Sequence, residues 1–276
     1  MISIKFLVEN RTNKSGVLAE HGLAIYIEAC GKKILFDAGS TDIIIENAER
    51  MGVKLDEIDM AVVSHGHYDH TGGFPAFCGI NENAPIYIHR NAFREIYDVK
   101  DGRPYGKMSG IRWTDEQRKA LEKRLVLTDG AVMIDEDICI TGTLPDEEGF
   151  VPTEPFMYID EDGSTKLDDM SHEQCLVIRQ DEGLYVFSGC SHKGVVSAIN
   201  GAKAAFPGED IALLVAGMHL FNSSAEERSR VVEKITAAGA HKIIPVHCTG
   251  LEAICDLKMK MGDRCILASA GDSYEG

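Results

Sequence analysis

The stretch Met60-Ala61-Val62-Val63-Ser64-His65-Gly66-His67-Tyr68-Asp69-His70-Thr71-Gly72-Gly73 places three histidines and one aspartate within six positions, directly after an apolar run. A strand that ends with this apolar run would deliver these side chains into a loop at a sheet edge, where imidazole nitrogens and a carboxylate can converge on zinc or a related ion. His65 and His67 alternate and can bind one ion, whereas Asp69 and His70 point elsewhere and can bind a second. A histidine-rich surface turn is the alternative, but scattered histidines rarely follow a buried strand at this spacing. The stretch therefore predicts a metal site that can hold two ions.

The motif His-x-His-x-Asp-His stands about thirty residues after Leu35-Phe36-Asp37-Ala38-Gly39. Together the two blocks resemble the metallo-β-lactamase superfamily of metal-dependent hydrolases. The resemblance implies an α/β fold with four layers, an αββα sandwich of two mixed β-sheets flanked by helices. The length agrees with a single domain over residues 1–276, since α/β domains of this size are often undivided.

Five further blocks resemble one branch of this superfamily. That branch includes the archaeal 7,8-dihydropterin-6-yl-methyl-4-(β-D-ribofuranosyl)aminobenzene 5'-phosphate synthase family and many bacterial relatives of unknown substrate. The blocks run from residue 8 to about residue 250, so the resemblance covers nearly the whole chain. They are Val8-Glu9-Asn10, Glu20-His21-Gly22-Leu23, Ser188-Gly189-Cys190-Ser191-His192, Gly217-Met218-His219-Leu220 and Pro245-Val246-His247-Cys248-Thr249-Gly250.

The composition narrows the classes of partner. The chain has 276 residues, with 28 Lys and Arg against 44 Asp and Glu, a formal net charge of −16. This charge disfavours a polyanionic partner, so we expect a small-molecule substrate and no nucleic acid. No run of about eighteen apolar residues exists and the first residues lack a signal-peptide pattern, so we expect no membrane span and a cytoplasmic protein. The eight cysteines include no Cys-x-x-Cys pair, which suits reduced thiols.

Strand, loop and helix patterns alternate along the chain. Residues 1–8 alternate like an edge strand, and Thr41 suits the N-cap of a helix over residues 41–51. The region from Asn91 to Leu125 differs from the rest: Thr114-Asp115-Glu116-Gln117 has the form of a capping box and opens a charged helix to about residue 123. We expect a helical insertion at about 91–125 that covers the active site, pairs two subunits in a homodimer, or is an ordinary surface excursion. The other predicted strands are 23–29, 33–36, 85–89, 131–134, 137–141, 174–179, 184–188, 211–216, 242–246 and 265–267, and the other predicted helices are 73–77, 194–205, 225–238 and 251–261.

Each ion needs about three protein ligands and an open position for water, so later residues are further candidates. His247 follows an apolar strand, as His65 does. By the resemblance, His247 would complete the set of the second ion with Asp69 and His70.

The third ligand of the first ion is open among three residues. By the superfamily pattern, His172 would be the ligand and Cys190 would replace the usual bridging aspartate. The thiolate of Cys190 could bind metal, since coordination lowers the pKa of a thiol. His192 belongs to the branch's own block and is the other candidate. These choices are not exclusive, and the departure from the usual Gly-Asp argues against a tightly bridged pair of ions.

Several residues would act around the ions. Asp37 stands where the superfamily has a carboxylate that accepts the far N–H of a ligand histidine and fixes its tautomer; a turn aspartate is the alternative. Asp69 would orient the attacking hydroxide as well as bind metal. His219, at another strand end, would contact substrate or stabilise a leaving group, with a packed histidine as the alternative. His21 belongs to a block near the site mouth and either contacts substrate or supports the loop.

These features favour a metal-dependent hydrolase of a small ester, with a phosphoester as the leading substrate class. Two divalent metal ions are the expected cofactors, with zinc favoured over manganese and iron. Metal-activated water would be the nucleophile, and the chain has neither a Gly-x-Ser-x-Gly elbow nor a phosphate-binding glycine loop. The alternatives are the transferase reaction of the synthase branch and a non-catalytic sensor or binding module that carries metal.

Overall fold

The computed structural model describes residues 1–152 and 154–276. Backbone contacts divide the chain into two compact units. Unit 1 comprises Met1–Asp129, Glu154–His172 and Ser269–Gly276, and unit 2 comprises Gly130–Thr153 and Glu173–Ala268. The expectation of a single undivided domain stays a prediction.

Unit 1 is built on a mixed seven-stranded sheet with the order β17-β1-β2-β3-β4-β5-β8. The strands from β17 to β3 pair antiparallel, and those from β3 to β8 pair parallel. Of the parallel strands, β4 and β5 lie inside the sheet and are largely buried, which explains their apolar runs, whereas β8 is an edge strand and is half exposed. The bounds are β1 Ser3–Val8, β2 Ala24–Ala29, β3 Lys32–Phe36, β4 Met60–Val62, β5 Ile86–His89, β8 Leu125–Thr128 and β17 Ser273–Glu275.

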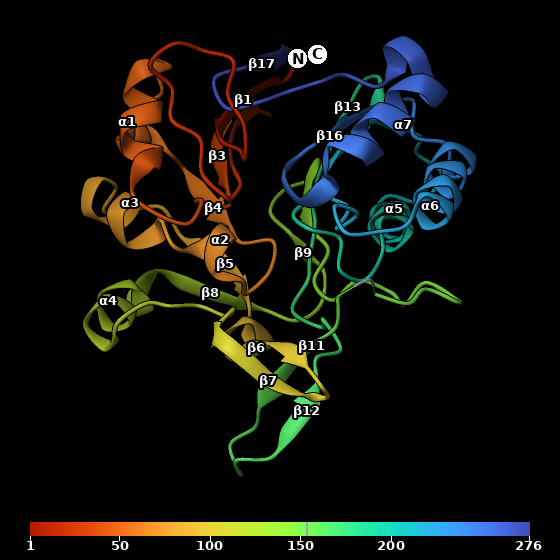
Figure 1. Cartoon of the computed structure of the whole chain (residues 1–276). Coiled ribbons are helices and arrows are strands. Elements are labelled where there is room, and N and C mark those ends of the chain that lie inside the picture. Colours follow the sequence, from red (N-terminus) through yellow and green to blue (C-terminus); the bar gives the residue numbers. More distant parts are fainter. Residues whose placement is uncertain (153) are drawn as a thin grey trace. The chain divides into compact units, whose positions relative to one another are not determined.

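Helices α1 (Ile43–Arg50) and α3 (Phe74–Ile80) lie side by side against this sheet (Figure 1). Helix α1 buries Ile44 and Ala48, which are four residues apart and so lie on one face. Phe74 and Phe77 of α3 join the same apolar core. The short helix α2 (Tyr68–Thr71) comes directly before α3 and carries part of the predicted metal motif.

The segment predicted as a helical insertion is only partly helical. It contains the strands β6 (Glu95–Lys100) and β7 (Arg103–Met108), followed by α4 (Asp115–Leu121). The capping box at Thr114 is confirmed, since its hydroxyl accepts the N–H of Gln117 while the Gln117 side chain accepts the N–H of Thr114. The strands belong to a separate antiparallel sheet of unit 1, with the order β12-β11-β6-β7, in which β11 is Phe156–Ile159 and β12 is Thr165–Leu167.

Unit 2 is built on a second mixed sheet, with the order β16-β15-β14-β13-β10-β9. Strands β14, β15 and β16 are parallel, so their carboxyl ends meet at the same edge. The bounds are β9 Val132–Met133, β10 Ile138–Ile140, β13 Leu176–Gln180, β14 Gly183–Ser188, β15 Ile211–Ala216 and β16 Lys242–Pro245. Helices α5 (Val195–Ala205), α6 (Ala225–Ala238) and α7 (Leu251–Met261) lie beside one another in this unit (Figure 1).

Three details of the sequence prediction are wrong. Strand β1 is not at an edge, because β17 pairs with it from the far end of the chain. The N-cap of α1 is Asp42 rather than Thr41, whose hydroxyl and N–H both bind Glu20. Residues 265–267 are not a strand: an isolated bridge pairs Cys265 with Ile243 directly after the 3₁₀ turn Gly262–Arg264.

Two other expectations can be compared with the structure. All eight cysteines lie within the described residues and none forms a disulfide, as expected for reduced thiols. No helix of the described chain is long and apolar enough to cross a membrane.

Glycine at position 72 is required by packing, and position 79 provides the matched control. A Cβ at Gly72 would lie 2.0 Å from the carbonyl oxygen of Ser40, whereas a Cβ at Gly79 in α3 would meet nothing within 4 Å. Gly72→Ala should therefore lower the urea midpoint. Gly79→Ala should raise the free energy of unfolding by about 0.5–1 kcal/mol, because alanine favours the helix. Equal effects of the two substitutions would contradict this assignment.

Candidate metal centre

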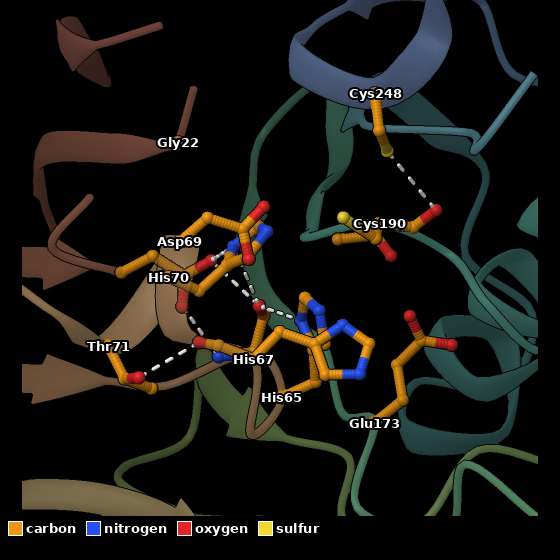
Figure 2. Close-up of polar contacts among 12 residues, drawn as sticks. Gly22, His65, His67, Asp69, His70, Thr71, Glu173, Cys190 and Cys248 are labelled. Carbon is orange, nitrogen blue, oxygen red and sulfur yellow. Dashed lines mark hydrogen bonds and ion pairs between the residues drawn. The ribbon is translucent and has the colours of Figure 1, made fainter. Parts of the chain in front are cut away.

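The loop after β4 brings the predicted histidines of unit 1 together. The ring centroids of His65 and His67 are 4.5 Å apart, and those of His65 and His70 are 4.2 Å apart. All three side chains are buried, and Figure 2 shows them gathered with Asp69 around the same turn. The loop packs closely against residue 92. A Cβ at Gly66 would lie 2.3 Å from the carbonyl oxygen of Ala92, so only glycine fits between the two histidines.

Asp37 fixes the orientation of His70. Its carboxylate accepts the N–H and the hydroxyl of Ser64, both at 2.7 Å, and its Oδ2 lies 2.6 Å from Nδ1 of His70. An ionised carboxylate only accepts, so Nδ1 of His70 carries the proton and Nε2 has the lone pair that a metal needs. The predicted contact between Asp37 and a motif histidine is confirmed.

His67 is held in the neutral form that binds metal. Burial, and next the neighbouring His172, lower the pKa of His67 from 6.5 to about 3. A neutral imidazole is the form of histidine that coordinates zinc. The ring of His67 also packs on Phe156 of β11, with centroids 4.5 Å apart.

Asp69 lies in α2 and contacts a histidine from an earlier loop. Its Oδ2 is 3.0 Å from Nε2 of His21, whose side chain is 54% exposed. His21 is thus the more accessible partner of a buried carboxylate. This places the predicted His21 block beside the metal motif within unit 1.

His172 differs from the other predicted ligands, because both of its ring nitrogens have partners. Nδ1 accepts the N–H of Gly66 at 3.1 Å, and Nε2 lies 3.1 Å from Oδ2 of Asp168. Burial, the largest influence, raises the pKa of Asp168, but the hydrogen bond and charge of His172 together with the N–H of Met170 outweigh it, and the pKa lies below its usual range. In these contacts neither ring nitrogen of His172 offers a lone pair to metal, and its expected role as a ligand stays a prediction beside those of His192 and Cys190.

The predicted residues of unit 2 gather at the carboxyl ends of its parallel strands. Cys190 and His192 follow β14, His219 follows β15 and His247 follows β16. Ser191, His219 and His247 have positive φ angles of 54°, 49° and 50°. Left-handed backbone at non-glycine residues costs about 1–3 kcal/mol and is concentrated at functional sites. His192 and His219 are neighbours, with ring centroids 4.4 Å apart.

Cys248 ties two of these strand ends together. Its Sγ accepts the N–H of His219 at 3.3 Å and lies 3.7 Å from the carbonyl oxygen of Cys190, the contact drawn dashed in Figure 2. A Cβ at Gly217 would lie 2.8 Å from this sulfur, so glycine allows the close approach. Cys248 therefore has a structural role. Cys190 is buried, and its thiol is of the donor type that binds zinc once it is deprotonated.

Glu173 is a residue of this site that the sequence analysis missed. It is fully buried, and its carboxylate accepts the N–H of His192 at 2.7 Å and of Lys193 at 2.8 Å. These bonds fix the loop that presents His192. A single glutamate before a strand carries no local signal for this task, because its partners lie about twenty residues further on.

The donor chemistry fits a borderline divalent metal such as zinc. The Nε2 atoms of four buried histidines make no hydrogen bond to the described residues, although every ring has other neighbours: His65, His67, His192 and His247. Unit 1 supplies imidazoles and the carboxylate of Asp69, and unit 2 supplies imidazoles and a thiol. Each set is of the kind that holds zinc.

Comparison with known proteins agrees with this chemistry. Residues 18–191 match the sequence profile of the metallo-β-lactamase superfamily. The chain belongs to this superfamily. The predicted membership is confirmed, and with it the metallo-β-lactamase fold. A solved structure described as a metal-dependent hydrolase of the β-lactamase superfamily is 27% identical to this member, has a TM-score of 0.83 and is matched over 100% of this chain and 99% of its own.

Two relatives from Methanocaldococcus jannaschii support the predicted branch. One is named 7,8-dihydropterin-6-methyl-4-(β-D-ribofuranosyl)-aminobenzene-5'-phosphate synthase; it is 30% identical over 247 residues, which cover 85% of this superfamily member and 83% of the relative. The other is an uncharacterised protein, 31% identical over 258 residues, which cover 92% and 93% of the two chains.

The buried His89 gives this superfamily member a specific acid sensitivity. Burial, and next His172, lower the pKa of His89 from 6.5 to about 4. The unfolded chain takes up this proton near pH 6.5, so stability that is complete above pH 6.5 falls as the pH drops towards 4. His89→Asn keeps an acceptor for the N–H of Asn91, which lies 3.1 Å from Nδ1, and removes the titration. Between pH 6.5 and pH 4, the free energy of unfolding should therefore fall by up to about 3 kcal/mol more in the wild type than in the variant.

Urea unfolding of the metal-free protein and the His89→Asn variant between pH 7 and pH 4 measures this difference. Identical pH slopes for the two proteins would contradict it.

Proposed function

We propose that the protein is a metal-dependent hydrolase of a small ester, with a phosphoester as the favoured substrate class. The observation that carries the proposal is the Asp37–His70 pair beside the neutral, buried His67. A carboxylate that fixes the tautomer of one imidazole next to a second imidazole held neutral is an arrangement suited to metal binding.

We assign two divalent ions, with zinc favoured. Unit 1 would contribute His65, His67, Asp69 and His70, and unit 2 would contribute His192, Cys190 and His247. The assignment of the unit 2 residues rests on the superfamily pattern and on donor chemistry. Since Cys190 binds metal only as a reduced thiolate, this assignment agrees with the expected cytoplasmic location.

When bound, divalent ions would lower the pKa of water to about 7 and polarise the phosphoryl or carbonyl oxygen next to the atom under attack. The carboxylate of Asp69 would orient the attacking water by accepting its hydrogen bond. His219, held by its backbone bond to Cys248, would contact the leaving group and donate a proton to it. A net charge of −16 favours a small substrate over a polyanion such as RNA.

A transferase activity is the second candidate, because of the 30% identity to the M. jannaschii synthase over 85% of this chain. In that reaction a dihydropterin pyrophosphate would condense with an aminobenzene ribosyl phosphate, and pyrophosphate would leave. Metal held by the same residues would then stabilise the departing pyrophosphate. Both candidates need metal and differ in the nucleophile, which is water in one and the amine of an aminobenzene in the other.

Elemental analysis of the purified protein, with turnover of bis(p-nitrophenyl) phosphate measured with and without chelator, tests the first candidate. Metal in the protein and turnover that stops with chelator would support a hydrolase. Bound metal without turnover, together with pyrophosphate release from the pterin substrate, would favour the transferase. No bound metal would refute both.

A further inference from the structure

His172 contacts the metal motif at its midpoint. Gly66 separates His65 from His67, and its backbone N–H donates to Nδ1 of His172 at 3.1 Å. On the other side of the same residue, the carbonyl oxygen of Ala92 leaves no space for a Cβ. The Gly66 peptide is therefore held between the 3₁₀ turn Arg90–Phe93 and the imidazole of His172.

The proton positions follow from these contacts. A backbone N–H can only donate, so Nδ1 of His172 must be the acceptor and the ring proton of the neutral imidazole is on Nε2. That proton points to Oδ2 of Asp168 at 3.1 Å, and both side chains are fully buried. No lone pair of the neutral ring remains for a metal ion. In this arrangement His172 contacts the motif without being a ligand.

Asp168 is itself anchored. Its Oδ1 accepts the N–H of Met170 at 3.0 Å and lies 3.3 Å from Nη1 of Arg94. The same Arg94 nitrogen lies 2.6 Å from Asp169, and the guanidinium lies 4.4 Å from the ring centre of Tyr158. A chain of contacts thus runs from β11 through Arg94, Asp168 and His172 to the Gly66 peptide, all within unit 1.

We propose that His172 is a positioning residue, which holds the Gly66 peptide so that the side chains of His65 and His67 are preorganised to bind one ion. The inference rests on the proposed function, because it takes His65 and His67 as ligands. The contact would increase metal affinity, because a loop that is fixed before binding loses less conformational entropy when the metal binds.

Two substitutions of His172 distinguish the roles of its two ring nitrogens. In His172→Asn the side-chain oxygen occupies the place of Nδ1 and can still accept from Gly66. In His172→Gln the polar end reaches the place of Nε2, so the contact to Asp168 is kept and the acceptor for Gly66 is lost. Exposed His241 provides a control, as His241→Ala.

The first measurement is Co²⁺ affinity by competition with a chromogenic chelator. We expect His172→Asn and His241→Ala to bind within about 3-fold of the wild type, and His172→Gln to bind roughly 10- to 100-fold more weakly, as for loss of other partners outside the ligand set. Equal loss in His172→Asn and His172→Gln would overturn the proposal and restore His172 as a ligand.

The second measurement needs no metal. Hydrogen exchange of the Gly66 amide, followed by NMR in the metal-free protein, should be faster in His172→Gln than in the wild type and unchanged in His172→Asn. An unchanged Gly66 amide in His172→Gln would overturn the proposal. If the wild type itself bound no Co²⁺, the proposed function would fail, whereas this exchange experiment would still report on the Gly66 contact.

Discussion

Replacing His65 and His67 together with alanine should remove most of the bound metal and abolish chelator-sensitive turnover while the fold survives. The two rings are buried neighbours at the end of β4, and they would supply two nitrogens to one ion. Metal affinity should fall by more than the roughly 10- to 100-fold that follows from removing a hydrogen-bonding partner of a ligand. Elemental analysis of the purified variant gives the metal content, and circular dichroism gives the fold.

His241→Ala is again the matched control for this double variant, because it removes an exposed histidine. It should keep the full metal content. A double variant with wild-type metal content would place the site elsewhere in the chain and refute the proposed function.

Asp37→Asn should weaken both the apo fold and the metal site. The carboxylate accepts from the backbone N–H of Ser64, from the hydroxyl of Ser64 and from Nδ1 of His70. An amide has only one oxygen, so its NH₂ group faces at least one of these donors and leaves it unsatisfied. The free energy of unfolding should fall by about 1–3 kcal/mol, and metal affinity should fall roughly 10- to 100-fold because the tautomer of His70 is no longer fixed.

Asp101→Asn is the control for the backbone. Asp37 and Asp101 both have positive φ, 58° and 52°, a conformation that asparagine tolerates, but Asp101 is exposed in the β6–β7 turn. Urea midpoints without metal and chelator competition with Zn²⁺ measure the two effects. If Asp37→Asn retained wild-type affinity for Zn²⁺, Asp37 would have no part in the metal site.

Local patterns were enough to predict most of the core elements. Helices over Ala225–Ala238 and Leu251–Met261 and the strand Ile211–Ala216 have the predicted bounds, because their hydrophobic periods and end signals agree. The contact of Asp37 with the motif could also be predicted, since it accompanies the motif in the superfamily and both blocks follow strands that are neighbours in the sheet.

The β6–β7 hairpin was missed although its signal is present. Ile96, Tyr97 and Val99 are residue types that favour strands, and Asp101-Gly102 is a dipeptide that favours a tight hairpin turn. Both turn residues have positive φ, as such a turn requires. The capping box at Thr114 lies in the same segment and predicts a helix, so the whole segment was predicted to be helical.

Other features could not be predicted from local patterns. The bond between Gly66 and His172 spans 106 residues, and the bond between Glu173 and the N–H of His192 spans 19. Neither residue type nor spacing reveals which buried acid or histidine will meet a particular backbone N–H. Strand β17 is only three residues long, and its pairing with β1 depends on the sheet edge that the start of the chain provides.

The left-handed backbone after the strands limits how the protein can be made more heat-resistant. Asp37, Ser191, His219 and His247 all have positive φ, and glycine would relieve this strain at each of them. At three of these positions the gain in thermal tolerance would come with the loss of a side chain assigned to chemistry. Ser191 is the exception, because its hydroxyl lies 2.9 Å from the hydroxyl of Ser188 and is not assigned to the metal site. At Asp37, His219 and His247, a glycine substitution would raise thermal stability and lower activity together. At Ser191, a glycine substitution could raise thermal stability without removing a side chain assigned to the site.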